Sequence, residues 1–402
     1  MTDDYGDWIE EYVREIAASA GVPDFVFKPL LVPKGGSTRE VGDSLLWVGH
    51  QLAIVSVKSR DPGIGSDSIP RRDSWMAKHV KKAISQINGT YRMLNTTSGL
   101  VLKSERGVLI PWDIHHVDVF TGVVVVDHPD PWDFEPDVTD SRIPTIVLAL
   151  DDWLTLHERY ASTAAVIRFV TWRARNGLPS LPLEAEKDII ASVHAAEEDL
   201  PLGAPIEVKP GAWERAWRDR PEIFFGTSPD HKYAKIVDNM IAGAADMDPL
   251  YTSIETTSDY LYIIEFLDRI SPFPRVEFGK GVVKKCQQVG ATGEWGAMLS
   301  ILPEGVIVFL SDPADREQRI KLLRSLTAAR HSQFMEATGI SGLVTLGIAT
   351  EPIPTTGRSH DFCLVQATFD LTESEKSMRD EIFGAIPPEL AQSLLSRYRG
   401  MA

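Results

Sequence analysis

Two predicted strands joined by a tight turn constrain the fold of this chain more than any other feature. Residues 43–48 are predicted to form a short strand, and a Gly-His turn leads into a compact apolar strand over residues 52–57, which ends at Lys58. Side chains alternate across a strand, so Ser56 and Lys58 are expected on the same face. This spacing predicts that Asp43, on the neighbouring strand, lies beside them at one end of a sheet.

Helices and further strands are predicted in the sequence on both sides of these two strands. Apolar residues at helical spacing, capping residues and Gly/Pro breaks predict both kinds of element. The expected helices cover residues 5–20, 74–94, 151–159 and 164–175, and the expected additional strands cover residues 25–32, 107–111, 117–126 and 143–150. This order predicts an α/β fold in which a mixed sheet is flanked by helices.

A second domain is predicted after the Asn-Gly-Leu-Pro break at residues 176–179. We therefore expect a first domain over residues 1–178 and an α+β domain over residues 180–402. Helices are expected over residues 182–199, 231–244 and 260–270, and strands over residues 295–302, 306–310, 342–349 and 362–369. The sequence of this second domain does not indicate its role.

The charge of the chain is unevenly distributed. The net charge is −16, which argues against a protein that coats nucleic acid without specificity. Residues 58–106 nevertheless contain ten basic and four acidic residues, a net charge of +6. Such a basic island is typical of a phosphate-binding surface, although a solvated helix face rich in lysine explains the charge equally well.

Composition also bears on the cellular compartment. The sequence has no apolar run long enough to span a bilayer, and its N-terminus is acidic, unlike a signal peptide. The two cysteines, Cys286 and Cys363, cannot build a disulfide framework or a cysteine-based zinc site. These features predict a cytoplasmic protein that does not act at a membrane.

An acid and a lysine on adjacent strands are suited to phosphodiester hydrolysis assisted by a metal ion. The carboxylate of Asp43 can hold Mg²⁺, which prefers oxygen ligands and contacts phosphate. Lys58 can orient the attacking water and offset the charge that builds on the phosphate. The alternative is a structural ion pair across strands, in which Lys58 protects a sheet edge.

The order of these residues resembles the PD-(D/E)XK nucleases, which are restriction-endonuclease-like enzymes. In that family, an acid is followed after a hairpin-length spacer by Asp, Glu or Gln, then any residue, then Lys at the end of an apolar strand. Asp43 matches the first acid and Lys58 the lysine, and the resemblance covers about the first 175 residues.

The resemblance implies further site residues. Family members often use a glutamate on the first helix, for which Glu11 is the candidate, with Glu10 and Glu15 as alternatives. Asp43, Glu11 and Glu40 are therefore the expected ligands of Mg²⁺ or Mn²⁺. The helix that follows resembles a glutamine-bearing helix of several branches of the family, and its expected nucleic-acid contacts are Lys78, Lys81, Lys82 and Gln86.

Ser56 departs from the family pattern, because it stands where the family has an acid or a glutamine. A hydroxyl is a poorer ligand for a divalent cation than a carboxylate, so metal affinity should fall unless Glu40 or Glu11 compensates. Three explanations are open: a migrated acid, a degenerate nuclease that still binds nucleic acid, and a deliberately introduced loss of the acid.

The expected function is metal-dependent cleavage of nucleic acid, DNA more than RNA, in restriction or antiviral defence, with Asp43, Ser56 and Lys58 as the catalytic group. The alternative is an inactive nuclease-fold scaffold that acts through its C-terminal domain. That domain is expected to recognise a protein partner, a modified substrate or a trigger, or to form a homo-oligomer.

Overall fold

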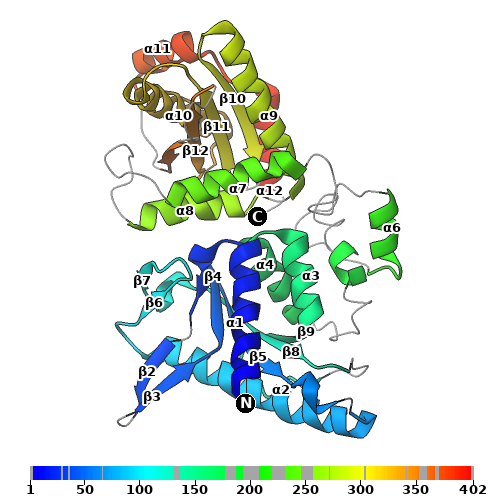
Figure 1. Ribbon diagram of the computed structural model, residues 1–402. Coiled ribbons are helices and arrows are strands. Elements are labelled where there is room, and N and C mark those ends of the chain that lie inside the picture. Colours follow the sequence, from blue (N-terminus) through cyan, green and yellow to red (C-terminus); the bar gives the residue numbers. More distant parts are fainter. Residues whose placement is uncertain are drawn as a thin grey trace. The chain divides into compact units, whose positions relative to one another are not determined.

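The computed structural model describes residues 3–399, except positions 29, 35–36, 66, 131–135, 177–186, 193–207, 220–230, 246–256, 271, 303–304, 341, 353–359 and 367–370. It contains two compact units (Figure 1). Unit 1 comprises residues 1–198 with residues 205–225, and unit 2 comprises residues 199–204 with residues 226–402.

Unit 1 is built on a five-stranded mixed sheet in the order β1-β4-β5-β8-β9. The strands are β1 (Val26–Phe27), β4 (Ser44–Val48), β5 (Gln51–Ser59), β8 (Val119–Asp127) and β9 (Thr145–Ala149). β4 runs antiparallel to both of its neighbours, β1 and β5, whereas β5, β8 and β9 are parallel to one another. The central parallel strands are buried on both faces, as the near-continuous valine run of β8 requires.

Helices cover both faces of this sheet (Figure 1). The apolar stripe of the long helix α2 (Ile69–Thr96) packs on the face formed by Ile54, Val124 and Val147. The other face is covered by α1 (Asp3–Ala20), α3 (Leu150–Tyr160) and α4 (Thr163–Arg175). This mixed sheet with helices on its faces confirms the α/β class predicted from the sequence.

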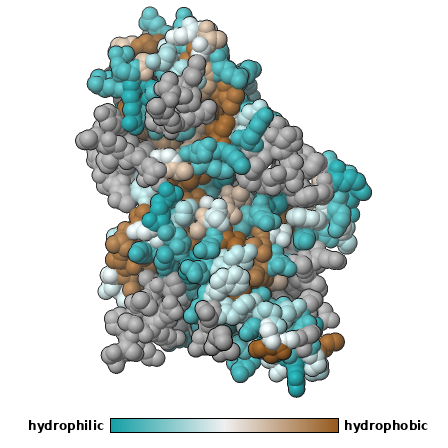
Figure 2. Space-filling view, viewed as in Figure 1, coloured by the Kyte–Doolittle hydropathy of each residue, from teal (hydrophilic) through white to brown (hydrophobic). Residues whose placement is uncertain are grey.

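Two short hairpins lie outside the main sheet of unit 1. They are β2 (Leu30–Lys34) with β3 (Ser37–Val41), and β6 (Val101–Lys103) with β7 (Leu109–Pro111). The outer face of the second hairpin exposes Val101 and Leu109 together with Lys103, and Figure 2 shows hydrophobic areas interspersed with hydrophilic ones on the surface of the molecule.

Unit 2 contains a four-stranded sheet in the order β10-β11-β12-β13. Its strands are β10 (Gly296–Leu302), β11 (Gly305–Ser311), β12 (Thr345–Thr350) and β13 (Asp361–Val365), and β11 and β12 are parallel. α10 (Arg316–Thr338) connects β11 to β12 and, with α12 (Pro388–Arg399), covers one face of the sheet. α9 (Pro272–Thr292) packs against the opposite face, where Phe278 contacts Phe309. Unit 2 is completed by α7 (His231–Ala245), α8 (Thr257–Asp268) and α11 (Glu373–Phe383).

Some elements differ from those predicted. The long helices α9 and α10 were not predicted, because the first contains prolines and glycines and the second has charged residues spread around much of its surface. α6 (Ala212–Asp219) belongs to unit 1, although the predicted boundary placed it in the second domain. Its position follows from Asp188, which accepts hydrogen bonds from the backbone N–H groups of Gly211 and Trp213.

Among the residues that the structure describes, no helix combines the length and apolar character needed to cross a membrane.

Candidate functional site

Asp43 lies at the turn that leads into β4. The preceding Gly42 has a φ of +70°, a conformation that favours glycine, and it packs close to Thr90 of α2. The backbone N–H of Asp43 donates to the carbonyl of Val55 on β5. The carboxylate, which is largely buried, therefore lies beside the C-terminal half of β5, where its Oδ2 accepts a 2.5 Å hydrogen bond from the N–H of Val57.

Ser56 connects the polar side chains of the site. Its hydroxyl lies 3.1 Å from Asp43 Oδ2 and 3.3 Å from Gln86 Oε1, and it accepts a 3.3 Å hydrogen bond from Lys58 Nζ. Lys58 Nζ also lies 3.7 Å from Asp43 Oδ2 and donates to the carbonyl of Val57. The structure thus brings Asp43, Ser56 and Lys58 together, as their spacing predicted.

The electrostatic environment of Lys58 is mixed. Burial lowers the pKa of Lys58 below its ordinary value of 10.5, and the nearby cation Lys82 lowers it further. The carboxylates of Asp43 and Glu10 act in the opposite direction, because they stabilise the charged ammonium group. The buried side chain is therefore under the opposing influence of two acids and a second lysine.

The register between α2 and β5 explains why Lys82 faces Lys58. Two residues of a strand advance by about 6.6 Å and four residues of a helix by about 6 Å. α2 follows β5 in sequence and runs in the opposite direction. Gln86 contacts Ser56, so Lys82, one helical turn before Gln86, lies close to Lys58, two residues after Ser56. A polar stripe on α2 thus follows the polar face of β5.

His79 belongs to the same stripe, three residues before Lys82. The pKa of His79 is lowered to about 4, first by burial and then by the positive charges of Lys78, Lys82, Lys58 and Arg60. The sequence reasoning missed His79, although its spacing from Lys82 and Gln86 was a usable signal. The Trp75 ring is stacked on the His79 ring, with the ring centroids 4.2 Å apart.

The predicted nucleic-acid contacts divide into two groups. Gln86 and Lys82 face the site, and Lys78 lies close enough to act on His79. Lys81 is 80% exposed and lies 3.9 Å from Asp140, so it points away from β5. Neither Lys78 nor Lys82 forms an ion pair with another residue of the described ranges, which leaves an excess of positive charge beside Lys58.

The acids expected to support Asp43 lie in three different settings. Glu11 is exposed on α1, whereas Glu10 is part-buried and acts on Lys58, because successive helix residues are rotated by about 100°. The first helix therefore directs Glu10, one of the alternatives, toward the site. Glu15 is also exposed. The backbone of Glu40 pairs with Leu31 in the β2–β3 hairpin, and its side chain lies outside the described part of the chain.

The donors at this end of β5 fit a magnesium site of low protein coordination. Mg²⁺ is commonly bound through one or two carboxylates and retains several waters, and backbone carbonyls are also suitable oxygen ligands. Asp43 supplies one carboxylate here and Val57 a carbonyl, while Glu10 is the carboxylate of α1 that acts on Lys58. Within the described ranges, no three acidic, histidine or cysteine side chains form a metal-binding group, and Ser56 places a hydroxyl beside Asp43.

Comparison with known proteins adds no relative: no protein-family model, curated protein or solved structure matches this chain.

Proposed function

We propose that unit 1 is a nucleic-acid-directed domain that hydrolyses phosphodiester bonds with Mg²⁺ or Mn²⁺, as in restriction or defence nucleases. The observation that carries this proposal is the convergence of Asp43, Lys58 and Gln86 on Ser56 at the end of β5. A carboxylate, a buried ammonium group and a neighbouring lysine are suited to bind both a hard cation and a phosphate.

Each side chain has a defined task in this proposal. Asp43 and Glu10 would hold the metal ion, which supplies Lewis-acid stabilisation of the phosphate when it is bound. Lys58, fixed by Asp43 and Ser56, would orient the attacking water and offset negative charge on the phosphate. Lys82 and Lys78 would hold the neighbouring phosphates of the strand through charge alone.

A second candidate is a protein of the same fold that binds nucleic acid without cutting it. Ser56 favours this candidate, since it supplies a hydroxyl where a carboxylate would complete a metal site. The hydrogen bonds that Asp43 accepts from Val57 and Ser56 favour it too, because they already engage one carboxylate oxygen.

Plasmid nicking and DNA binding, measured on the same variants, distinguish the two candidates. If the domain is a nuclease, the wild-type protein nicks plasmid with Mg²⁺ but not with EDTA, and Asp43→Asn and Lys58→Met reduce the rate at least a hundredfold. DNA binding should persist in Asp43→Asn, because that change removes a negative charge. Binding without Mg²⁺-dependent nicking supports the second candidate, and the absence of both rejects the proposal.

A further inference from the structure

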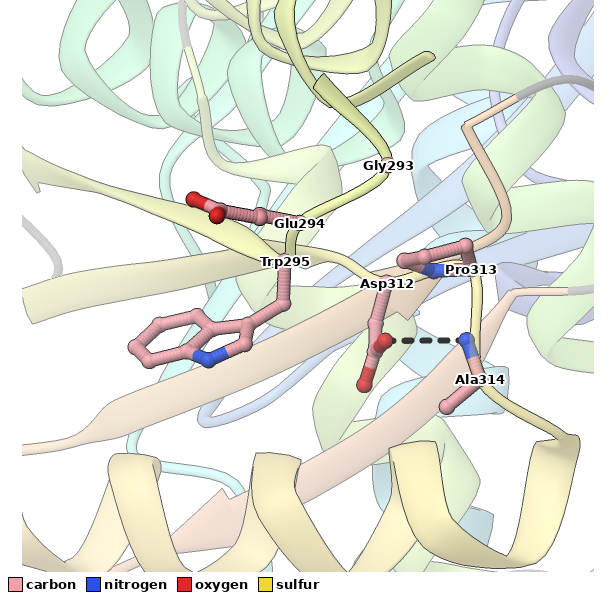
Figure 3. Close-up of a pocket in the computed structure, with 6 residues that line it drawn as sticks. All are labelled: Gly293, Glu294, Trp295, Asp312, Pro313 and Ala314. Carbon is pink, nitrogen blue, oxygen red and sulfur yellow. Dashed lines mark hydrogen bonds between the residues drawn. The ribbon is translucent and has the colours of Figure 1, made fainter.

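Unit 2 contains a pocket at one end of its sheet, remote in sequence from the candidate site. It has a volume of about 670 Å³ and is lined by Gly293, Glu294, Trp295, Asp312, Pro313 and Ala314. These residues come from the turn between α9 and β10 and from the loop that leads from β11 into α10 (Figure 3). Loops at the carboxyl ends of parallel strands, as at β11, commonly form ligand sites.

The register of the sheet explains why Trp295 and Asp312 face each other. Gly296 pairs with Ser311 at the end of the β10–β11 ladder, so Trp295 and Asp312 stand at the next pair of positions. Directly opposite residues of antiparallel strands project on the same face, about 5 Å apart. Figure 3 shows both side chains directed to the same side of the strands.

The two side chains differ in exposure. Trp295 is 48% exposed, so part of its side chain is accessible to a ligand, whereas Asp312 is only 6% exposed. The N–H of Ala314 donates to Asp312 Oδ1 at 2.9 Å and fixes the orientation of the carboxylate. No cationic side chain of the described ranges pairs with Asp312, although a buried carboxylate is costly without a positive partner.

The charges around the pocket select the class of ligand. Glu294 is a second acid in the lining, and Asp315, which caps α10, adds a third beside it. An anion would be repelled, whereas a flat or compact cation can lie over an indole ring and pair with a carboxylate at the same time. Two basic residues near the pocket, Arg316 and Arg319, are paired with Asp361 instead.

We propose that this pocket binds an organic cation, a guanidinium or alkylammonium group, between the Trp295 ring and the Asp312 carboxylate. The group can belong to an arginine or lysine side chain of a peptide or to a free polyamine. The proposal assigns a ligand to unit 2 and is independent of the function proposed for unit 1.

The test is an NMR titration of the full chain that follows the indole N–H of Trp295, identified from its loss in Trp295→Phe. N-acetyl-arginine amide and spermidine are the probes, and the citrulline analogue is the neutral control. Saturable shifts with either cation, and none with citrulline, support the proposal. A preference for the arginine probe indicates a peptide source and a preference for spermidine a polyamine.

Matched variants test the roles of the two side chains. Asp312→Asn retains the acceptor for the Ala314 N–H but removes the charge, so the affinity for either cation should fall about tenfold. Glu294→Gln, at the exposed rim, should reduce it about twofold, and Tyr262→Leu, which removes an exposed aromatic outside the pocket, should not change it. Equal binding of citrulline, binding of adenosine in place of the cations, or unchanged affinity in Asp312→Asn would overturn the proposal.

Discussion

Ser56 is the residue on which the chemistry of the candidate site depends. Its hydroxyl contacts the acid, the lysine and the glutamine that converge there, and it is fully buried. A serine can satisfy these groups by hydrogen bonds but contributes no negative charge. Lys58 is consequently balanced by Asp43 at 3.7 Å and by the field of Glu10.

Substitutions of Asp43 and Lys58 should therefore have strongly non-additive effects on the free energy of unfolding. Lys58→Met leaves the buried Asp43 carboxylate without its cation, and we expect the free energy of unfolding to fall by about 3 kcal/mol. Asp43→Asn should be destabilising as well, and the double variant should lose less than the sum of the two. Urea unfolding of the four proteins measures this cycle, and additive losses would contradict the described pair.

His157, on α3, should make the stability of unit 1 depend on pH. Burial lowers the pKa of His157 to about 4 in the folded protein, compared with 6.5 for an ordinary histidine. The unfolded chain therefore binds the proton more readily. This contribution to stability is complete above pH 6.5 and is lost as the pH falls toward 4.

The size of this effect can be isolated with a variant that does not titrate. Between pH 7.5 and pH 5, the wild-type protein should lose about 2 kcal/mol more stability than His157→Gln, which retains a donor for the carbonyl of Trp153. Urea unfolding at both pH values measures the difference. Equal losses of stability in the two proteins between these pH values would show that His157 is not responsible for the pH dependence.

At the scale of the element, we expect nucleic acid to contact only the face of α2 that contains Lys82. Lys82 faces β5, whereas the neighbouring Lys81 lies near Asp140 on the other side, so the two lysines form a matched pair of test positions. We expect Lys82→Glu to weaken DNA binding at least tenfold and to reduce the slope of log K against log salt by about 1. Lys81→Glu should leave both nearly unchanged.

Fluorescence anisotropy with a labelled duplex across a range of salt concentrations measures both quantities. Equal losses of DNA affinity in Lys81→Glu and Lys82→Glu would mean that DNA contacts the outer face of the helix, or that it responds only to the total charge of the helix.

The sequence predicted this part of the site because local rules determine it. Alternation along β5 places Ser56 and Lys58 on one face, and the tight turn returns Asp43 to them. The orientation of α1 could not be predicted with the same accuracy. A difference of one residue rotates a helical side chain by about 100°, and tertiary packing therefore decides whether Glu10 or Glu11 faces Lys58.

Unit 2 was less predictable for a different reason. α10 is a long helix with charged residues around much of its surface, and several of these are buried in pairs such as Arg319 with Asp361. Such partners are distant in sequence, so periodicity does not reveal them. The facing positions of Trp295 and Asp312 likewise depend on the register of β10 with β11, which was not predicted.

For the molecule as a whole, the units suggest a division of roles. Unit 1 carries the cationic face beside Asp43, whereas unit 2 carries an acidic pocket with an exposed tryptophan. In the proposed function, a chain with a net charge of −16 would bind nucleic acid through a local surface, and α2 with the end of β5 is the candidate.

The central claim, that this end of β5 is a metal-assisted phosphodiester site in which Ser56 replaces an acid, is tested most directly by Ser56→Glu. Ser56→Gln is the control, because it has nearly the same size without the charge. The measurement is the melting temperature of both variants with EDTA and with Mg²⁺, together with plasmid nicking under the same conditions.

Ser56→Glu places a second carboxylate beside Asp43, so it should be less stable than Ser56→Gln in EDTA and recover several degrees with Mg²⁺. Its Mg²⁺-dependent nicking should equal or exceed that of the wild-type protein. If Ser56→Glu and Ser56→Gln respond identically to Mg²⁺ and neither they nor the wild-type protein nicks DNA, the claim is contradicted.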